Sequence, residues 1–596
     1  MKKIKTLEYP ELEKLLCDIQ KPGRYVDHEI RTSSKDPAQL EGIPGSVTCA
    51  LAFPDIYEIG MPNLGLQILY DIINRSPGFS AERIFSPWTD FEERLRETGT
   101  RIFSLENRIF LDCFDMVGFN LQHELLYTNM LNMLDLGKIP LHAEKRGPEY
   151  PLICAGGPAM VNPQPVSIFT DFIVIGDGEE VIIPILERVG AYKEGNRERA
   201  WFLKQISSID GVYIPSAYKF YYFGDGRIKK IDPPAKVKKA ILADLDSFEV
   251  VKSPVIPNIK PVHDRFAVEI MRGCARGCRF CQAGFIYRPV RQRKVGPLID
   301  QCSEGLKNTG YDEISFLSLS SADYRDLNRL VEGVLEKSRG ERLSISFPSL
   351  RLDSFNISLA ELIQGGRKTG LTFAPEAGSQ RMRDIISKNI TESQILDCIS
   401  IAFGRGWEKV KLYFMIGFPG ENQDDILAIP QLVERIADIA RASMPPRKRR
   451  RLNINININV FNPKPFTPFQ WAAQDRVEVL EQKFKIILEN IPKRSIKVTW
   501  SQPEKSQLEC ALSKGDTRMC KVVEEAWQRG AKFDNWTDIF DLEAWKQAFS
   551  SQGLEPGFYT TRGYSPEEIL PWDNIDIGVS KKFLISQYNK AIGLLK

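Results

Sequence analysis

The stretch EIMRGCARGCRFCQAGF, residues 269–285, decides the fold of the chain. It carries three cysteines in the spacing C-x3-C-x2-C, namely Cys274, Cys278 and Cys281. Thiolates grouped so tightly hold zinc or iron–sulfur centres, and a structural zinc normally has four protein ligands. Neither Cys302 nor His263 lies at a usual ligand spacing from the loop. The loop therefore predicts a centre with one open metal position, against the alternatives of a zinc knuckle or three unrelated thiols.

Strand-like and helix-like segments alternate six times from this stretch onward. The strands are expected at residues 266–271, 312–320, 342–350, 371–375, 409–417 and 452–460. Amphipathic runs, such as residues 323–338, separate them. Six β/α units form a partial TIM-type barrel, a (β/α)6 core over residues 266–470. Barrel enzymes place their chemistry at the carboxyl ends of the strands, so the turns at these ends are the candidate site.

The cysteine stretch and the barrel pattern resemble the radical S-adenosylmethionine (SAM) superfamily. Its signature is this spacing with an aromatic residue, here Phe280, just before the third cysteine. The resemblance implies that Cys274, Cys278 and Cys281 are the catalytic, metal-ligating residues of a 4Fe–4S cluster, whose unligated iron chelates SAM. It also implies reductive cleavage of SAM to methionine and a 5′-deoxyadenosyl radical, which abstracts hydrogen from a substrate. An electron donor such as a flavodoxin or ferredoxin would be a partner.

Further SAM-binding candidates follow from the same resemblance at the strand ends. In chain order the candidates are Phe280, Ser320, Ser321, Asp323, Arg351, Glu376, Gly417 and Gly420. The second strand ends in small hydroxyls and a carboxylate, where the family usually has Gly-Gly-Glu to hold the amino end of SAM. The fifth ends in GFPGE, which resembles the glycine-rich turn beside the adenosyl group. Each residue alone is equally consistent with an ordinary turn, and together they favour a SAM site.

Residues 46–195 are expected to form a doubly wound, Rossmann-like α/β module. Short apolar strands are predicted at residues 47–54, 83–87, 115–121, 151–157 and 172–178. Helices are predicted at residues 63–74, 88–99 and 123–137 and from about residue 180. This alternation is typical of a parallel sheet. Ligands of such folds bind outside the carboxyl ends of the strands, so the module's strand ends are candidate binding turns.

Four of these turns resemble the cobalamin-binding module in order and position. The candidate residues are Tyr57, Gly60, Gly65, Asn120, Gly156, Gly157, Gly176 and Gly178. Tyr57 stands where the cobalt-ligating histidine of D-x-H-x-x-G would be, so cobalamin is held without that ligand or is not held at all. The glycines are interpreted as places where backbone passes close to a large flat ring. Bound cobalamin would make the enzyme a methyltransferase; the alternatives are a bare α/β scaffold and another ligand.

The remaining segments and the composition set limits on the function. Residues 1–45 are interpreted as an N-terminal arm, 196–265 as a linker with a β-hairpin, and 471–596 as a mainly helical C-terminal region. A net charge of +3 gives no whole-chain argument for nucleic acid or membrane binding. No apolar run is long enough to span a bilayer, and the start lacks the apolar stretch of a signal peptide. A cytoplasmic protein is expected.

Two basic features invite a nucleic-acid hypothesis: the arginines around the cysteine loop and the run Pro445–Arg451. The second feature is more typical of a solvated loop. Two readings compete with a cobalamin-dependent enzyme: a radical SAM enzyme without cobalamin, and a non-catalytic iron–sulfur protein that binds RNA or senses redox state. The scattered N-terminal cysteines disfavour a methylthiotransferase with a second cluster. The substrate stays open among small molecules, RNA and protein.

Overall fold

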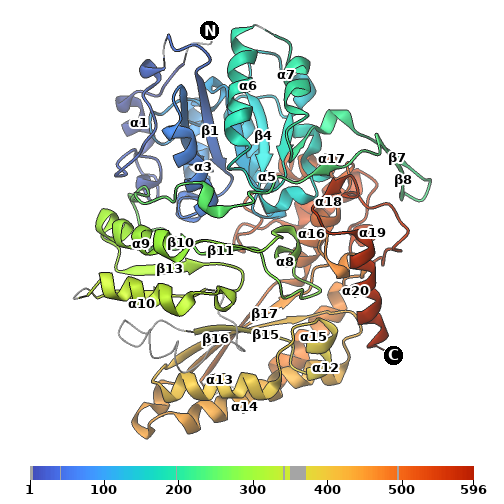
Figure 1. Ribbon diagram of the computed structural model, residues 1–596. Helices are drawn as coiled ribbons and strands as arrows, with labels where there is room; N and C mark the ends of the chain where they lie inside the picture. Colours follow the sequence, from blue (N-terminus) through green and yellow to red (C-terminus); the bar gives the residue numbers. More distant parts are fainter. Residues whose placement is uncertain are drawn as a thin grey trace.

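The computed structural model describes residues 4–40, 42–195, 197–339, 342–348, 371–492 and 495–595. A parallel sheet built by the N-terminal part lies above two sheets of the core, and the C-terminal part runs along one side of both (Figure 1). Over the described ranges, no helix combines the length and the apolar character that crossing a bilayer requires.

The N-terminal sheet has six strands in the order β2-β1-β3-β4-β5-β6. Their bounds are β1 Val47–Phe53, β2 Phe79–Phe85, β3 Met116–Asn120, β4 Leu152–Gly156, β5 Phe172–Val174 and β6 Val212–Tyr213. The first five are parallel, and β6 is antiparallel to β5. The strand order reverses between β1 and β3, which is where doubly wound sheets bind ligands. The predicted doubly wound fold is confirmed.

Helices cover both faces of this sheet. One face is covered by α3 (Leu64–Arg75), α6 (Ile182–Glu194) and α7 (Arg199–Ile206), and the other by α4 (Thr89–Thr98) and α5 (Tyr127–Leu136). The short helix α1 (Tyr9–Leu15) packs its leucines into the α4 side. Because α7 and β6 belong to the sheet's packing, the module extends past residue 195. A two-residue strand such as β6 is too short to show a sequence period.

The segment after the module contains the predicted hairpin and one unpredicted pairing. Strands β7 (Lys219–Tyr222) and β8 (Ile228–Asp232) pair antiparallel around the Gly-Asp-Gly turn. Farther on, β9 (Val237–Lys238) pairs in parallel with β19 (Ile575–Asp576). The linker is therefore joined to the C-terminal region by backbone hydrogen bonds.

The core consists of two parallel sheets. The first contains β10 Phe266–Glu269, β13 Glu313–Leu317 and β14 Ser344–Ser346, and the second contains β15 Leu371–Glu376, β16 Lys409–Ile416, β17 Asn453–Val460 and β18 Ile496–Trp500. All six predicted strands are present. The seventh, β18, pairs with β17, so the core continues beyond residue 470 into the region that was expected to be mainly helical.

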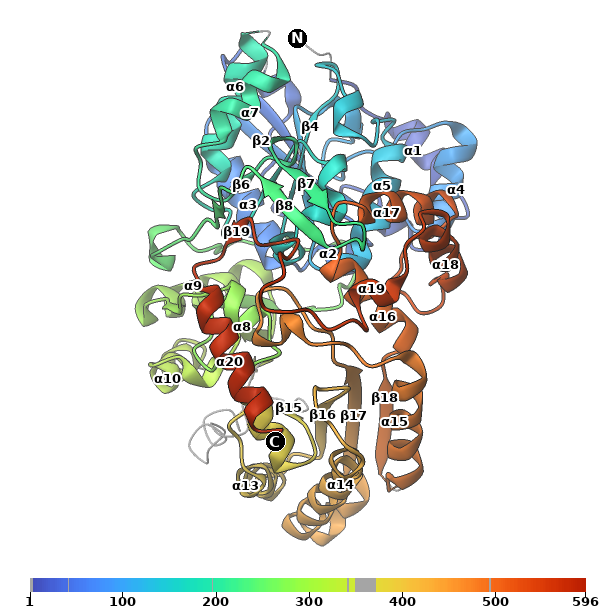
Figure 2. The same cartoon turned by 90° about the vertical axis from the view of Figure 1, so that its right-hand side faces the viewer.

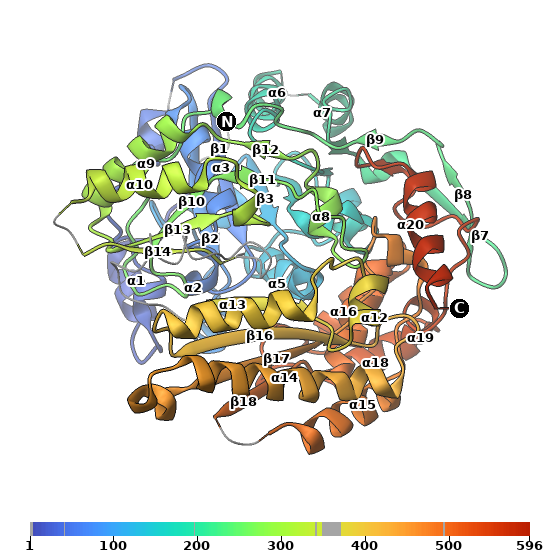
Figure 3. The ribbon, with the colours of Figure 1, turned by 60° about the horizontal axis from the view of Figure 1, so that its bottom comes forward.

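Amphipathic helices cover the outer faces of these sheets. They are α9 Val295–Thr309, α10 Leu327–Lys337, α13 Glu392–Gly404, α14 Gln423–Ser443 and α15 Val477–Asn490. Figure 3 shows the last three running alongside β16, β17 and β18. In β17 the isoleucines are buried toward these helices, while the alternating asparagines are half-buried or exposed on the other face. This strict alternation is what fixes the register of the strand.

The C-terminal helices pack chiefly on the N-terminal module. They are α16 Pro503–Lys514, α17 Met519–Gln528, α18 Leu542–Ser551, α19 Pro556–Tyr559 and α20 Lys581–Gly593. Met130 of α5 and Val523 of α17 lie in one apolar cluster, and the Thr128 hydroxyl donates to Asp534 at 2.6 Å. Figure 2 shows α20 descending from the module toward the core. Trp545 and Trp572 of this region are fully buried in the same apolar cluster.

Candidate functional site

The cysteine loop lies between β11 (Met271–Arg272) and the short helix α8 (Ala283–Ile286). None of its three cysteines is in a disulfide bond, and all three are partly exposed. The Arg276 N–H faces the Cys274 sulfur at 3.5 Å. Burial, together with the neighbouring Cys278, raises the pKa of Cys281 to about 11. No group of three His, Cys, Asp or Glu side chains within the described ranges already converges on a common metal position. The three thiols are therefore close together along the loop, but their sulfur atoms do not surround a common metal position.

Residues outside the loop hold it in place. The Arg279 N–H donates to the Ile386 carbonyl at 3.0 Å, and its guanidinium donates to the Ile385 carbonyl at 2.5 Å, after helix α12 (Gln380–Ile385). The Phe280 ring packs against Phe418 of the GFPGE turn, with centroids 5.6 Å apart. The loop is thus tied to the turns that follow β15 and β16. Three thiols on an anchored and partly exposed loop fit a metal centre with three cysteine ligands.

The turn after β13 presents two serines and one carboxylate. The Ser320 hydroxyl is buried and has no hydrogen-bond partner among the described residues. The Ser321 hydroxyl lies 2.9 Å from that of Ser318. Asp323 accepts from the Arg276 guanidinium of the cysteine loop at 2.8 Å. The buried, unpaired Ser320 hydroxyl is the feature of this turn that most calls for a ligand, because buried polar groups are normally hydrogen-bonded.

The turns after β15 and β16 are held by charged residues. Glu376 has a φ of +68° and accepts from the Lys388 ammonium at 2.9 Å. The Gly417 N–H donates to the buried Glu421 carboxylate at 2.7 Å, and the Gly420 carbonyl accepts from Arg381 at 3.1 Å. These turns lie at the carboxyl ends of the strands, as predicted. Arg351, the remaining SAM-binding candidate, lies outside the described residues.

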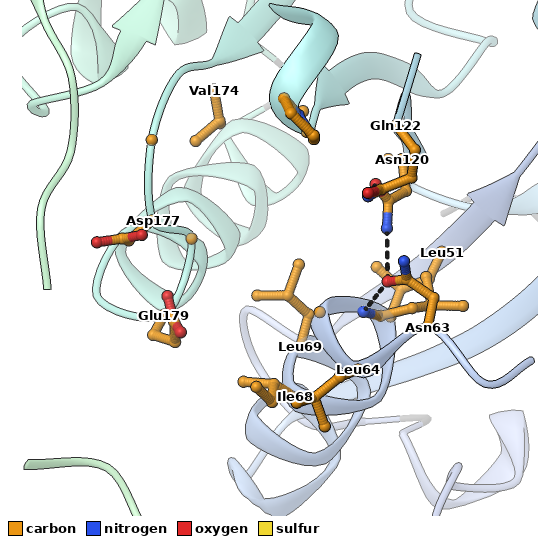
Figure 4. Close-up of a pocket in the computed structure, with 18 of the residues that line it drawn as sticks. Leu51, Asn63, Leu64, Ile68, Leu69, Asn120, Gln122, Val174, Asp177 and Glu179 are labelled. Carbon is orange, nitrogen blue, oxygen red and sulfur yellow. Dashed lines mark hydrogen bonds between the residues drawn. The ribbon is translucent and has the colours of Figure 1, made fainter. Parts of the chain in front are cut away.

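A cavity of about 700 Å³ lies between the N-terminal sheet and the core. Its walls come from the carboxyl ends of β1, β3, β4 and β5, from the residues directly before the first cysteine, and from the end of β13. Figure 4 shows the leucines and the isoleucine of the α3 side facing the turn that carries Asp177 and Glu179. The predicted residues that line it are Gly65, Asn120, Gly156, Gly157, Gly176 and Gly178.

Neutral amides and one histidine form a polar strip in this largely apolar cavity. The Asn120 amide donates to the Asn63 side-chain oxygen at 3.1 Å (Figure 4). The Gln122 amide donates to Asn120 at 2.5 Å. His123 also lines the cavity, and burial lowers the pKa of its imidazole below the ordinary value of 6.5. Sequence reasoning missed Asn63, Gln122 and His123, although all three stand next to turns that it had singled out.

Two predicted cofactor residues lie away from the cavity. Tyr57, in the short helix α2 (Tyr57–Gly60), is 1% exposed, and its hydroxyl donates to Glu29 at 2.6 Å. Gly60 packs against the rings of Phe85 and Phe53, where a Cβ would come within 2.8 Å of both. Neither residue lines the cavity. Packing under the β1 turn directs Tyr57 and Gly60 away from this cavity, so their predicted part in cofactor binding stays a prediction.

The reason given for two of the glycines also changes. At Gly157 (φ +105°) an added Cβ would lie 2.6 Å from the Leu121 carbonyl oxygen, and at Gly176 (φ +107°) it would lie 2.1 Å from that of Ala240. Backbone segments of the chain itself therefore require these glycines. Packing within the chain, rather than the approach of a ligand, therefore accounts for these two glycines.

An ion network closes the cavity on the core side. Arg272 contacts Asp177 and Glu179 of the turn after β5 and also Glu269 of β10. Burial alone would raise the pKa of Asp177, but Arg272 and Arg291 outweigh it, so the pKa lies below its ordinary value. Sequence reasoning missed this network, because the residues of the turn are more than ninety positions away from Arg272 and no local pattern announces the pairing.

Two family models match the chain. Residues 268–433 match the model described as "Radical SAM superfamily", and residues 65–215 match the one described as "Radical SAM proteins, N-terminal". The first range begins in β10 and contains the cysteine loop and the turns after β13, β15 and β16. Residues 268–433 are therefore a radical SAM domain.

Relatives of this radical SAM enzyme are similar over different lengths. An uncharacterised protein of Methanocaldococcus jannaschii is 28% identical over 80% of the chain and 90% of its own length. An uncharacterised methyltransferase of Pyrococcus horikoshii is 25% identical over 45% of the chain and 53% of its own length. Among solved structures, the radical SAM methyltransferase TsrM from Kitasatospora setae, with cobalamin and a 4Fe–4S cluster bound, is 14% identical with a TM-score of 0.47. That likeness covers 73% of this chain and 78% of TsrM.

The arginines around the cysteine loop of this radical SAM enzyme are engaged within the protein. Arg272 and Arg291 pair with Asp177, and Arg276 pairs with Asp323. The Arg288 guanidinium donates to the Gly284 carbonyl at 2.9 Å. These side chains are not arranged as a free phosphate-binding surface, which removes the first of the two features behind the nucleic-acid hypothesis.

Proposed function

We propose that this radical SAM enzyme holds a 4Fe–4S cluster on Cys274, Cys278 and Cys281, cleaves SAM reductively, and binds cobalamin in the cavity for methyl transfer to a substrate. One observation carries the cobalamin part of the proposal. The cavity wall includes Met271, Arg272 and Gly273, which directly precede the first cysteine. A ligand in the cavity would therefore be a neighbour of the cluster. The relative named as a methyltransferase supports the reaction class.

The cavity residues suit a large, mostly apolar ring that carries amide groups. Leucine and isoleucine side chains of α3 form an apolar wall, and Asn63, Asn120 and Gln122 offer amides that can pair with amides of a ligand. Tyr57 does not reach the cavity, so the cobalt would have no ligand from this position. Cobalamin would be held by shape and by the amides.

The residues around the cysteine loop would bind and orient SAM. When bound, the cluster supplies the electron for SAM cleavage, and cobalamin supplies a transferable methyl group. The unpaired Ser320 hydroxyl is available to accept or donate a hydrogen bond to SAM. Asp323 and Glu376 would hold its cationic amino group after exchanging their present partners. Phe280 and Phe418 form the apolar floor that excludes water beside the cluster.

The electron would come from a protein reductant such as a flavodoxin or ferredoxin, and the enzyme would work in the cytoplasm. None of the eleven cysteines of the chain is in a disulfide bond. Free thiols, many of them buried, are typical of a reducing compartment.

Anaerobic reconstitution tests the proposal. The full-length protein, loaded with iron and sulfide, is reduced with dithionite in the presence of SAM, with and without hydroxocobalamin. We expect 5′-deoxyadenosine in both samples. We expect S-adenosylhomocysteine, the product left when SAM gives up a methyl group, only with cobalamin. A lack of 5′-deoxyadenosine above the background of the metal-free protein would refute the enzymatic proposal. Deoxyadenosine without retained cobalamin would leave a radical SAM enzyme that uses no cobalamin.

A further inference from the structure

One arginine connects the wall of the cavity to the start of the cysteine loop. Arg272 ends β11, two residues before Cys274, and its side chain is only 12% exposed. Its guanidinium lies 2.9 Å from Asp177, 2.6 Å from Glu179 and 2.9 Å from Glu269. The first two carboxylates belong to the N-terminal module and the third to the core. All three and the arginine line the cavity.

The module side of this contact is itself fixed. Asp177 also accepts from Arg291 and from the Leu242 N–H, the latter at 2.9 Å. The preceding Gly176 forms a parallel bridge with Ala240. The turn is therefore held on both sides, and its carboxylates have little freedom to follow a displaced arginine.

The core side leaves equally little freedom between Arg272 and the first cysteine. Strand β11 pairs antiparallel with β12 (Arg291–Gln292), so that Arg272 lies opposite Arg291. Gly273 has a φ of +88°, and an added Cβ there would lie 2.7 Å from the carbonyl oxygens of both Tyr287 and Pro289. Only this tightly enclosed glycine separates Arg272 from Cys274. A shift of the arginine would be passed on to the cysteine loop.

We propose that Arg272 is a positioning residue that sets the cysteine loop against the cavity, with Asp177 and Glu179 as its anchors. The inference rests on the proposed function, since it assumes a cluster on the three cysteines. The planar guanidinium reaches carboxylates on different elements at once, which a lysine ammonium, as a single point charge, does not do in the same geometry. The planar geometry of the Arg272 guanidinium, in addition to its charge, is what holds the loop.

The test compares Arg272→Lys, Arg272→Gln and Glu179→Gln with the wild-type protein, all full-length and reconstituted anaerobically. Arg265→Gln is the matched control, because Arg265 contacts Glu313 at 3.3 Å beside the same sheet but does not line the cavity. The measurements are iron per chain, the electron paramagnetic resonance (EPR) spectrum of the reduced cluster with and without SAM, and the rate of 5′-deoxyadenosine formation.

We expect both Arg272 variants to keep their iron within about twofold, to show an altered EPR response to SAM, and to form 5′-deoxyadenosine about 10- to 100-fold more slowly. Glu179→Gln keeps two of the three contacts, so its rate of 5′-deoxyadenosine formation should fall only a few-fold. This variant tests the inference if the Arg272 variants do not fold. Full activity of Arg272→Lys, or wild-type EPR spectra in all variants, would overturn the inference. If the wild-type protein cleaves no SAM, the proposed function fails, while the EPR comparison still decides the role of Arg272.

Discussion

The cavity in the N-terminal module and the strand-end turns of the core offer ligands very different surroundings. In the cavity the predicted residues are glycines, of which Gly157 and Gly176 are required by neighbouring backbone, and an asparagine that bonds other amides. In the core the two predicted carboxylates are each paired with a cation, Asp323 with Arg276 and Glu376 with Lys388. Contacts within the chain explain the two glycines of the cavity, whereas the carboxylates of the core would have to exchange partners to bind a ligand.

This difference shows what residue types do and do not reveal. A glycine or a carboxylate at a strand end predicts where a site lies, because the carboxyl ends of parallel strands meet at one edge. It does not reveal whether the group is free. Whether it is free depends on residues farther away in the sequence, such as Arg276, which lies 47 positions before its partner Asp323. Experiments that separate the two regions therefore test the two halves of the proposal independently.

The largest effect is expected from a substitution that abolishes the chemistry of the core and leaves ligand binding in the cavity unchanged. In Cys278→Ala the cluster would lose one of its three ligands, so we expect loss of bound iron and 5′-deoxyadenosine at background level. Cobalamin retention should be unchanged, because Cys278 does not line the cavity. Iron analysis, the SAM-cleavage assay and the visible spectrum measure the three quantities. Cys17→Ala, at an exposed cysteine, is the control. A variant that keeps its cluster and cleaves SAM would show that the metal lies elsewhere.

The converse change fills the cavity and leaves the core intact. Gly118 lies on β3 in register with Leu51 and Cys154, which also line the cavity, and an added Cβ would meet nothing closer than 3.9 Å. Gly118→Val should therefore fold and project into the cavity. We expect cobalamin binding to weaken about tenfold, equal to ~1.4 kcal/mol, with SAM cleavage retained. Equilibrium titration measures the affinity.

The same substitution at Gly296, where an added side chain meets open space, is the control for Gly118→Val. Unchanged cobalamin affinity in Gly118→Val would place the cobalamin site outside this cavity. Equal losses of cobalamin binding and of SAM cleavage would mean that the two regions are not separable, and the comparison above would fail.

Much of this architecture follows from local sequence signals. The strands of the N-terminal module and of the core are visible in the sequence as apolar runs or strict alternation. Strand β17, with its alternating Ile and Asn, is the clearest case. Strand β18 was missed because it follows the long helix α15 in a region that otherwise reads as helical. The cysteine loop and the glycine turns could be located because their residue types have specific uses.

The surroundings of Tyr57 and the ion contacts of Arg272 could not be predicted from the sequence, for the same physical reason. Tyr57 matches a motif position, yet its ring is buried against Phe85 and bonded to Glu29 of the N-terminal arm. The junction at Arg272 pairs residues of two separate segments. Tertiary packing decides both cases, and packing between distant segments leaves no periodic trace in the sequence.

A smaller effect tests whether the ion pairs of the core give way to a ligand. Asp323→Asn removes the charge that would hold the amino group of SAM but keeps the size of the side chain. We expect SAM to bind about 3- to 10-fold more weakly, or ~1 kcal/mol, with iron content unchanged. Equilibrium dialysis with labelled SAM measures the affinity, and Asp397→Asn on the exposed face of α13 is the control. Unchanged affinity would leave Asp323 only the role of fixing Arg276.

The smallest effect concerns His123, the titratable group on the polar strip of the cavity. Burial is the largest influence on its imidazole and lowers its pKa in the folded protein. The unfolded chain, with a pKa near 6.5, then binds a proton that the native state does not, so stability is lost as the pH falls through that value. His123→Phe should remove a slope of up to about 1.4 kcal/mol per pH unit below pH 6.5. Urea unfolding at pH 5.5 and 7.5 measures the difference, with His28→Phe at an exposed position as the control. Equal slopes in wild type and variant would mean that enough water reaches the polar strip of the cavity to solvate the imidazolium.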